Sequence, residues 1–261
     1  MNAGKRQAHA STGANDVVLD VRNATKRFGS VLALDNVSIR ARRGEVLALL
    51  GDNGAGKSTL IKCISGVHQI DSGSIRLDGV PTQIKSPGGA REAGIETVYQ
   101  DLALFDNLTP AQNFYAGREI AFPSWLPPGL RFMRRREMEA VTGEVLERLK
   151  VTLPGAGATV ALMSGGQRQA VAVARASVFA RKVVILDEPT AALGQRESRK
   201  VLDLIAQLRD EGNAVILITH NMEHVTELAS LAVVLRQGRK VGELVPTRAN
   251  QHDLISMIVG A

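Results

Sequence analysis

The chain has 261 residues, of which 44% are hydrophobic, 22% charged and only 3% aromatic, and its formal net charge is +6. This composition predicts a globular protein with one large α/β domain. It excludes a membrane-spanning protein, because apolar runs such as residues 231–235 fall far short of the roughly 18 residues of a membrane span. The positive charge suits a nearby anionic membrane surface. It does not indicate a nucleic-acid partner, because no basic run is interleaved with aromatic residues that stack on bases.

Residues 1–15 are small and polar, with Lys5, Arg6 and His9 but no apolar segment. They predict a flexible tail and not a signal peptide, which places the protein in the cytoplasm. Cys63 is the single cysteine, so an internal disulfide is excluded and a cysteine-built zinc site is disfavoured. We expect Cys63 to pack as a small apolar residue in a helix.

Residues 17–21 and 38–42 alternate apolar and polar side chains, which predicts two half-buried antiparallel strands. Phe28, next to Gly29, is expected in the turn between them. There it can either anchor the core or offer an aromatic face to an adenine ring. Residues 74–77 predict a further strand, followed by a turn at residues 78–79.

The central motif is the run Gly-Asp-Asn-Gly-Ala-Gly-Lys-Ser-Thr at residues 51–59, which matches a phosphate-binding loop without mismatch. Residues 45–50 before it predict a buried parallel strand, and the residues after it open a helix, as the motif requires. Glycines without a Cβ let the backbone curl and present N–H groups to phosphate oxygens. Lys57 is expected on the β- and γ-phosphates and the Ser58 hydroxyl on magnesium. The motif therefore predicts a nucleoside triphosphate ligand.

Residues 94–100 predict a strand that ends on Gln100, either a solvated amide or a contact to the metal and the attacking water. Residues 101–164 have a different character, with prolines at positions 110, 123, 127, 128 and 154 and helical periodicity over 138–149. They predict a helical subdomain inserted into the α/β core. Within it lies an arginine cluster, which is either a solvated helix start or a contact with lipid or a partner: Arg131, Arg134, Arg135 and Arg136.

Ser164 is predicted to cap the helix that follows it, and the two glycines after it make this helix start a second possible anion site. Residues 183–186 predict a buried strand leading into Asp187 and Glu188, adjacent carboxylates that can hold magnesium and polarise water beside a phosphate. An amphipathic helix is expected over 196–210, and a buried strand over 214–219 that ends at His220. The remainder predicts two short strands around residues 237–238 and a final helix.

Together these residues resemble the nucleotide-binding subunit of ATP-binding-cassette (ABC) transporters, from about residue 17 to the C-terminus. Residues 51–59 look like the Walker A loop, Gln100 like the Q-loop glutamine, and His220 like the switch histidine. Residues 164–167 look like the family signature and residues 183–188 like the Walker B strand. The resemblance implies a P-loop NTPase (RecA-like) core with an N-terminal antiparallel β-subdomain and an inserted helical subdomain. The implied domain spans 16–261, with the core at 16–100 and 165–261 and the insertion at 101–164.

The resemblance also implies a head-to-tail homodimer that closes two ATP molecules between its subunits. Glu188 would be the general base for the attacking water, His220 would contact the γ-phosphate, and Gln100 would sense metal and water. Magnesium would be held by Ser58, Gln100 and Asp187. The implied nucleotide-binding set, with adenine on Phe28 and the signature acting across the dimer, is Phe28, Gly51, Asn53, Gly54, Ala55, Gly56, Lys57, Ser58, Thr59, Ser164, Gly165, Gly166 and Gln167.

Two positions depart from the family pattern. Met163 stands where a leucine often precedes the signature, and Gly194 stands where most members carry an aspartate that contacts the opposite subunit. The run 188–194, Glu-Pro-Thr-Ala-Ala-Leu-Gly, is similar to the branch that energises monosaccharide importers of the ribose, xylose and fructose kind. Many of those carry two fused cassettes, whereas this sequence has one.

The sequence therefore predicts an ATPase subunit that powers import of a simple sugar. Its expected partners are a membrane permease and, indirectly, a sugar-binding protein, with the subunit held on the inner face of the plasma membrane. An importer of amino acids or an exporter is an alternative, because hydrolysis motifs do not encode cargo. A non-transport ATPase acting on ribosomes or DNA is another, although the sequence has neither a second cassette nor sustained heptads.

Overall fold

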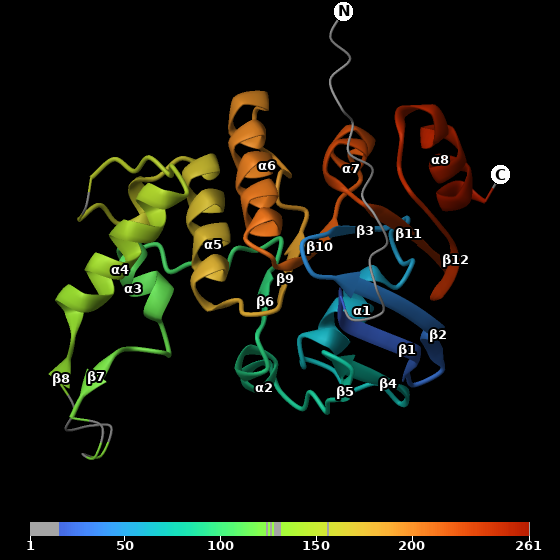
Figure 1. The fold of residues 1–261 in the computed structure, drawn as a ribbon, viewed down its shortest axis with the longest axis horizontal. Coiled ribbons are helices and arrows are strands. Elements are labelled where there is room, and N and C mark those ends of the chain that lie inside the picture. Colours follow the sequence, from blue (N-terminus) through green and yellow to red (C-terminus); the bar gives the residue numbers. More distant parts are fainter. Residues whose placement is uncertain (1–15, 124, 126, 128–131, 156, 261) are drawn as a thin grey trace, which may run out of the picture.

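The computed structural model describes residues 16–123, 125, 127, 132–155 and 157–260 (Figure 1). The predicted tail at 1–15 and Arg131 lie outside the described residues. The strands are β1 (Val17–Phe28), β2 (Val31–Arg42), β3 (Val46–Leu50), β4 (Ser72–Leu77), β5 (Val80–Pro81), β6 (Ile95–Val98), β7 (Ala121–Phe122), β8 (Phe132–Met133), β9 (Val183–Asp187), β10 (Ala214–Ile218), β11 (Leu231–Arg236) and β12 (Arg239–Leu244).

The α-helices are α1 (Lys57–Ile64), α2 (Pro87–Glu92), α3 (Pro110–Tyr115), α4 (Arg135–Arg148), α5 (Gly165–Phe179), α6 (Gln195–Asp210), α7 (Met222–Leu228) and α8 (Gln251–Val259). The described residues also form two short 3₁₀ helices, η3 (Val160–Leu162) and η4 (Arg248–Asn250). In the part of the chain that the structure describes, no helix combines the length and the apolar character needed to cross a membrane.

The N-terminal strands form an antiparallel sheet in the order β2-β1-β4-β5. β1 and β2 each have 12 residues, so they are longer than the alternation predicted. Register shifts interrupt their pairing near Asn23 and Asn36, which adopt positive φ angles of 51° and 57°. The bulges break the alternation that the sequence analysis relied on while the backbone pairing continues. Phe28 is therefore the last residue of β1, opposite Val31, and the prediction that it lies in the turn is wrong.

The second sheet has six strands in the order β12-β11-β3-β10-β9-β6. β11, β3, β10, β9 and β6 run parallel, and β12 pairs antiparallel at one edge. β3 and β10 are buried along their whole length, as expected for apolar parallel strands covered on both faces. The predicted α/β P-loop NTPase fold, with its N-terminal antiparallel sheet, is confirmed.

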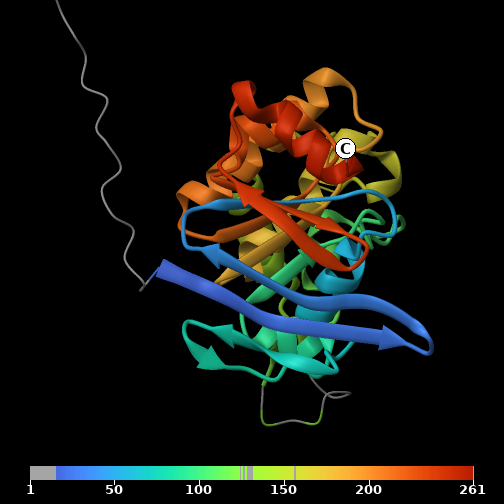
Figure 2. The same ribbon diagram turned by 90° about the vertical axis from the view of Figure 1, so that its right-hand side faces the viewer.

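The two faces of this sheet are covered by different layers (Figures 1 and 2). Leu47 and Leu49 of β3 belong to a core cluster shared with α1 and the four-stranded sheet, and Cys63 of α1 is buried in it as predicted. Val46 belongs to a cluster on the opposite face, which includes Val171 of α5 and other residues of α4, α5 and α6. Burying each such aliphatic side chain contributes about 1.5–3 kcal/mol. The sheet is thus fixed between α1 on one side and α5 with α6 on the other.

Residues 101–164 contain α3, α4, η3 and a two-stranded hairpin, β7–β8, which the sequence analysis did not predict. A capping box on Thr109 starts α3, with Pro110 as its first helical residue. Met138 and Leu146 of α4 pack in the same apolar cluster as α5 and the six-stranded sheet. The predicted insertion therefore shares its core with the α/β part, and its boundary at residue 164 stays a prediction.

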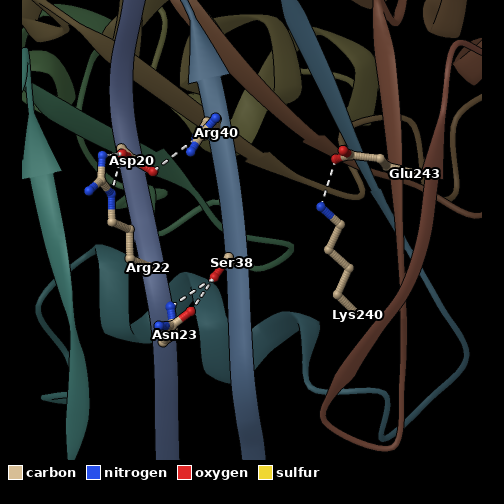
Figure 3. Close-up of polar contacts among 7 residues, drawn as sticks. All are labelled: Asp20, Arg22, Asn23, Ser38, Arg40, Lys240 and Glu243. Carbon is tan, nitrogen blue, oxygen red and sulfur yellow. Dashed lines mark hydrogen bonds and ion pairs between the residues drawn. The ribbon is translucent and has the colours of Figure 1, made fainter.

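A polar cleft of about 520 Å³ lies between β1, β2 and β12 (Figure 3). On one wall, the Asp20 carboxylate accepts hydrogen bonds from Arg22 at 2.6 Å and from Arg40 at 3.3 Å. On the other wall, the Lys240 ammonium donates to Glu243 at 2.7 Å. The charged side chains drawn in this cleft are thus paired with one another.

Candidate nucleotide-binding site

The glycine-rich loop follows β3 and leads directly into α1, in the order that the motif requires. Gly51, Gly54 and Gly56 have φ angles of 147°, 78° and 101°, a region that favours glycine. A Cβ at Gly51 would collide with the carbonyl oxygen of Leu235, and one at Gly56 would lie 2.9 Å from that of Ala33. The loop is therefore tightly enclosed between β2 and β11, and side chains would prevent its closure.

Lys57 lies across this loop. Its ammonium donates to the backbone carbonyls of Gly51, at 2.7 Å, and Asp52, at 3.0 Å. Ser58 is exposed in the first turn of α1, while Ala55 is buried. These hydrogen-bond partners of Lys57 are neutral carbonyls and not carboxylates. Lys57 also lies at the start of a helix, where the backbone already favours an anion.

Asp187 ends β9, and Glu188 follows with a positive φ of 51°. Burial raises the pKa of Asp187 above its usual value, the adjacent Glu188 carboxylate adds to the rise, and Lys57 and Lys62 oppose it. Glu188 is anchored through its backbone N–H, which donates to the carbonyl of Ile218 at 2.9 Å. Asp187 thus stands at the end of β9, and the backbone of Glu188 is fixed to the end of β10. The two adjacent carboxylates follow a buried strand, as predicted.

The Glu188 carboxylate contacts the His220 imidazole, with 3.0 Å between Oε1 and Nδ1. Both residues were expected at strand ends, whereas the contact between them was not predicted. The contact follows from the parallel register, in which Ile218 of β10 pairs with Asp187 of β9. Glu188 comes one residue after Asp187, and His220 comes two residues after Ile218. The Glu188 side chain is 17% exposed and that of His220 is 82% exposed. The histidine therefore stands on the solvent side of the pair.

Gln100 comes two residues after the end of β6 and is exposed. β6, β9, β10 and β3 are parallel neighbours, so their carboxyl ends share one edge of the sheet. This edge brings together the strand-end residues and the loop at 51–59. The predicted strand is too long by two residues, since β6 ends at Val98 and Gln100 lies beyond it. The contact of Gln100 with a metal or water stays a prediction.

Ser164 is the N-cap of α5, as predicted. Its hydroxyl accepts from the Gln167 N–H at 3.2 Å, and its own N–H donates to Gln167 Oε1 at 2.9 Å. Gly166 packs on the next helix, because a Cβ there would lie 2.6 Å from Cγ of Glu197. Gly194 caps α6, and a Cβ on it would lie 2.8 Å from Oε2 of the same glutamate. Glu197 thus occupies space that an aspartate at position 194 would need.

The structure does not bring residues 164–167 to the glycine-rich loop. α5 covers one face of the six-stranded sheet and α1 the other. Among the described residues, no hydrogen bond or ion pair joins these two segments. Four cavities of about 520, 330, 750 and 630 Å³ are each lined by residues outside 51–59. Within one chain, the loop and the helix start at Gly165 are therefore separate, and anion binding at the helix start stays a prediction.

Phe28 is 42% exposed at the end of β1. Its ring centroid lies 5.0 Å from that of His68, in an edge-to-face arrangement, and 5.4 Å from the Lys26 ammonium. The exposed ring is available for stacking, and its contact with adenine stays a prediction.

The parallel sheet, the glycine-rich loop and the carboxylates at the sheet edge define a P-loop domain that binds and hydrolyses ATP. Residues 34–191 match the family model described as ABC transporter. The chain therefore belongs to the ABC transporter family, as an ATP-hydrolysing subunit.

Similar proteins cover nearly the whole chain. The fructose import ATP-binding protein FrcA of Rhizobium meliloti is 47% identical over 249 residues, which span 95% of this chain and 96% of the relative. The xylose/arabinose import ATP-binding protein XylG of Sulfolobus acidocaldarius is 45% identical, covering 92% of this chain and 93% of the relative. The crystal structure of an ABC transporter's ATP-binding cassette in its ADP conformation superposes with a TM-score of 0.79 at 25% identity, covering 94% of this chain and 99% of that one.

Proposed function

We propose that this ATPase powers the import of a simple sugar through a membrane permease. The observation that carries the proposal is the 47% identity to a fructose import ATP-binding protein along almost the full length of both chains. The 45% identity to a xylose/arabinose import protein supports a monosaccharide as the class of cargo. The site fixes the reaction, ATP hydrolysis, and the relatives favour the cargo.

The chemistry rests on groups at the sheet edge. The loop amides and Lys57 bind the phosphates, and Glu188 takes a proton from the attacking water. The contact between Glu188 and His220 orients this carboxylate before ATP arrives. When His220 turns to the γ-phosphate, Glu188 is free to accept the proton. Gln100 approaches the same edge from the end of β6 and would contact the water and metal.

The residues at this edge fit a magnesium ion. Ser58 offers an exposed hydroxyl and Asp187 a carboxylate, which are oxygen donors of the kind that magnesium prefers. No group of three or more His, Cys, Asp or Glu side chains gathers as a metal site within the described ranges, so nucleotide oxygens and water would complete the coordination. When bound, magnesium neutralises charge on the β- and γ-phosphate oxygens.

A second copy of the chain would complete each ATP site. The helix start at Ser164, Gly165 and Gly166 lies away from the glycine-rich loop of the same chain. Ser164 caps this helix, and Ser164 and Gly165 are exposed to solvent. In a head-to-tail homodimer this helix start would cover the γ-phosphate bound to the partner's loop. Because Gly194 has no side chain, the contact across the dimer would be made by Glu197, whose carboxylate lies in the adjacent space.

The permease would dock at the cavity of about 330 Å³ between β6, α2 and α3. Phe105 is 56% exposed at its rim. Arg175 of α5 donates to the carbonyls of Leu102 and Ala103, and Arg168 pairs with Asp106 at 3.7 Å. The loop after Gln100 is thereby tied to the signature helix, so a permease segment seated here would sense both. Docking there would hold the subunit on the cytoplasmic face of the membrane, with a sugar-binding protein on the other.

The deciding experiment purifies the chain from its native membrane in mild detergent and assays ATPase activity with a panel of monosaccharides and the co-purified proteins. We expect a permease to co-purify and one sugar with its binding protein to stimulate hydrolysis. A permease without any sugar response would favour another cargo. No membrane partner at all would favour the non-transport alternative.

The assignment of Glu188 is tested separately. We expect Glu188→Gln to lower ATP turnover by roughly 10²- to 10⁴-fold, the scale of a general base, with ATP binding retained. Near-normal turnover in this variant would overturn the role of Glu188.

The docking site is tested by charge reversal at Asp101 and Asp106. Permease assembly and transport that stay intact in these variants would overturn the docking site.

A further inference from the structure

The β7–β8 hairpin exposes large hydrophobic side chains that no described part of the chain covers. Phe122, Trp125, Phe132 and Met133 are 56%, 80%, 77% and 51% exposed. The chain holds only one tryptophan, two tyrosines and six phenylalanines, so a third of its aromatic residues lie on this one hairpin. Figure 1 places β7 and β8 beneath α3 and α4, away from both large sheets. The exposed rings therefore belong neither to the core nor to the nucleotide site.

Basic side chains adjoin these rings. The guanidinium of Arg134 lies 5.1 Å from the centroid of the Phe122 ring and pairs with Glu137 at 2.8 Å. Arg135 and Arg136 follow in the first turn of α4, and both are exposed. We call these residues the aromatic–arginine patch: Phe122, Trp125, Phe132, Met133, Arg134, Arg135 and Arg136.

The patch is attached firmly to the body of the molecule. The Arg134 N–H donates to the carbonyl of Ile120 at 2.8 Å, which closes the base of the hairpin, and Phe122 pairs with Phe132 across it. Met138, less than two turns into α4, is buried in the main apolar cluster. A surface that binds the patch is therefore held at a fixed place relative to α3 and α4.

We propose that the aromatic–arginine patch binds an anionic lipid surface. Aromatic side chains partition to the interface between headgroups and acyl chains, and arginines beside them pair with acidic headgroups. Charge complementarity favours a membrane with anionic lipids as the occupant, because among the described residues the three consecutive arginines have only Glu137 as an acidic partner. The contact is distinct from docking on the permease, since the cavity proposed for the permease is lined by other residues.

Trp125 makes the test direct, because it is the only tryptophan of the chain. The full chain is mixed with vesicles of phosphatidylcholine, with or without phosphatidylglycerol, and both tryptophan emission and co-flotation are recorded. We expect a blue shift and flotation with the anionic vesicles, weakened by salt because screening shortens the reach of the charges. The assay contains no nucleotide, permease or sugar, so its outcome is independent of the proposed transport function.

The matched variants are Arg135→Glu, in the patch, and Arg248→Glu, an exposed arginine in η4. Arg135→Glu should lower partitioning into anionic vesicles by roughly five- to tenfold, and Arg248→Glu should leave it within about twofold. Phe132→Ser should reduce the blue shift. Equal losses in both arginine variants would overturn the proposal, because net charge alone would then explain binding. An unchanged Trp125 emission with anionic vesicles, or an equal shift with neutral ones, would also overturn it.

Discussion

Two regions of the molecule collect charged side chains, the carboxyl edge of the six-stranded sheet and the cleft of Figure 3, and they hold them differently. In the cleft, each charged side chain is paired with one of opposite charge: Asp20 lies between two arginines, and Lys240 pairs with Glu243. At the sheet edge, Lys57 is held by the backbone carbonyls of Gly51 and Asp52. A charge held by neutral groups remains available to a ligand, whereas paired charges largely cancel. In this molecule, the lysine that is hydrogen-bonded to backbone carbonyls therefore marks the active site better than the large polar cleft does.

Within the comparison of these two regions, the largest expected effect comes from removing that lysine. Lys57→Ala should lower ATP hydrolysis by roughly 10²- to 10³-fold, the scale for one electrostatic contact to a developing charge. Turnover is measured at saturating ATP alongside Lys62→Ala, which removes an exposed lysine from the same helix. Equal losses in the two variants would show that general charge, and not the position of Lys57, stabilises the developing charge.

Backbone geometry should matter next. Gly51→Ala places a methyl group against the Leu235 carbonyl at a φ of 147°, and we expect it to lower the free energy of unfolding by about 1–3 kcal/mol. Gly54→Ala is the control, because a Cβ at Gly54 meets nothing within 4 Å, although its φ of 78° is also positive. Urea unfolding of both variants measures the difference. Equal losses would show that φ alone, and not the close approach to β11, sets the cost.

In the cleft, the larger effect should follow from Asp20. Asp20→Ala leaves the guanidinium groups of Arg22 and Arg40 without their shared partner, and water replaces it only in part because the Asp20 side chain is 9% exposed. The arginine side chains are 48% and 61% exposed and hydrate readily, so we expect a loss of about 1 kcal/mol in unfolding free energy. ATP turnover per folded molecule should not change. A loss of turnover would mean that the cleft is coupled to the sheet edge.

The smallest effect is expected for Lys240→Ala. The pair with Glu243 is a surface contact, with side chains 26% and 50% exposed, and such pairs contribute about 0.2–1 kcal/mol. Urea midpoints at low and high salt measure it, and high salt should shrink the difference from the wild type. A stability loss as large as that of Asp20→Ala would contradict the contrast between an exposed pair and a nearly buried carboxylate.

The sequence was informative where one short pattern determines local geometry. The glycines of the loop at 51–59, the cap at Ser164 and the turn at residues 237–238 each specify a backbone conformation by themselves, and the structure contains all three. The apolar runs of β3, β9 and β10 identified buried parallel strands for the same reason.

Pairings between distant residues were not accessible in this way. The contact between Glu188 and His220 depends on the register of β9 and β10, and the close approach of Gly166 to Glu197 depends on how α5 meets α6. Local periodicity says nothing about either. The β7–β8 hairpin was missed because each strand has only two residues, too few for any alternation to show.

The position of β3 at the middle of its sheet also has a consequence for biosynthesis. β3 pairs with β10 and β11, whose residues are made long after residues 46–50 have left the ribosome. The strand that carries the glycine-rich loop lacks both neighbours until residue 218 emerges and one of them until residue 236 emerges. Closing such long parallel connections is slow. A nascent chain shortened before β10 should therefore fail to retain ATP, and the full chain should acquire this ability only late in its synthesis.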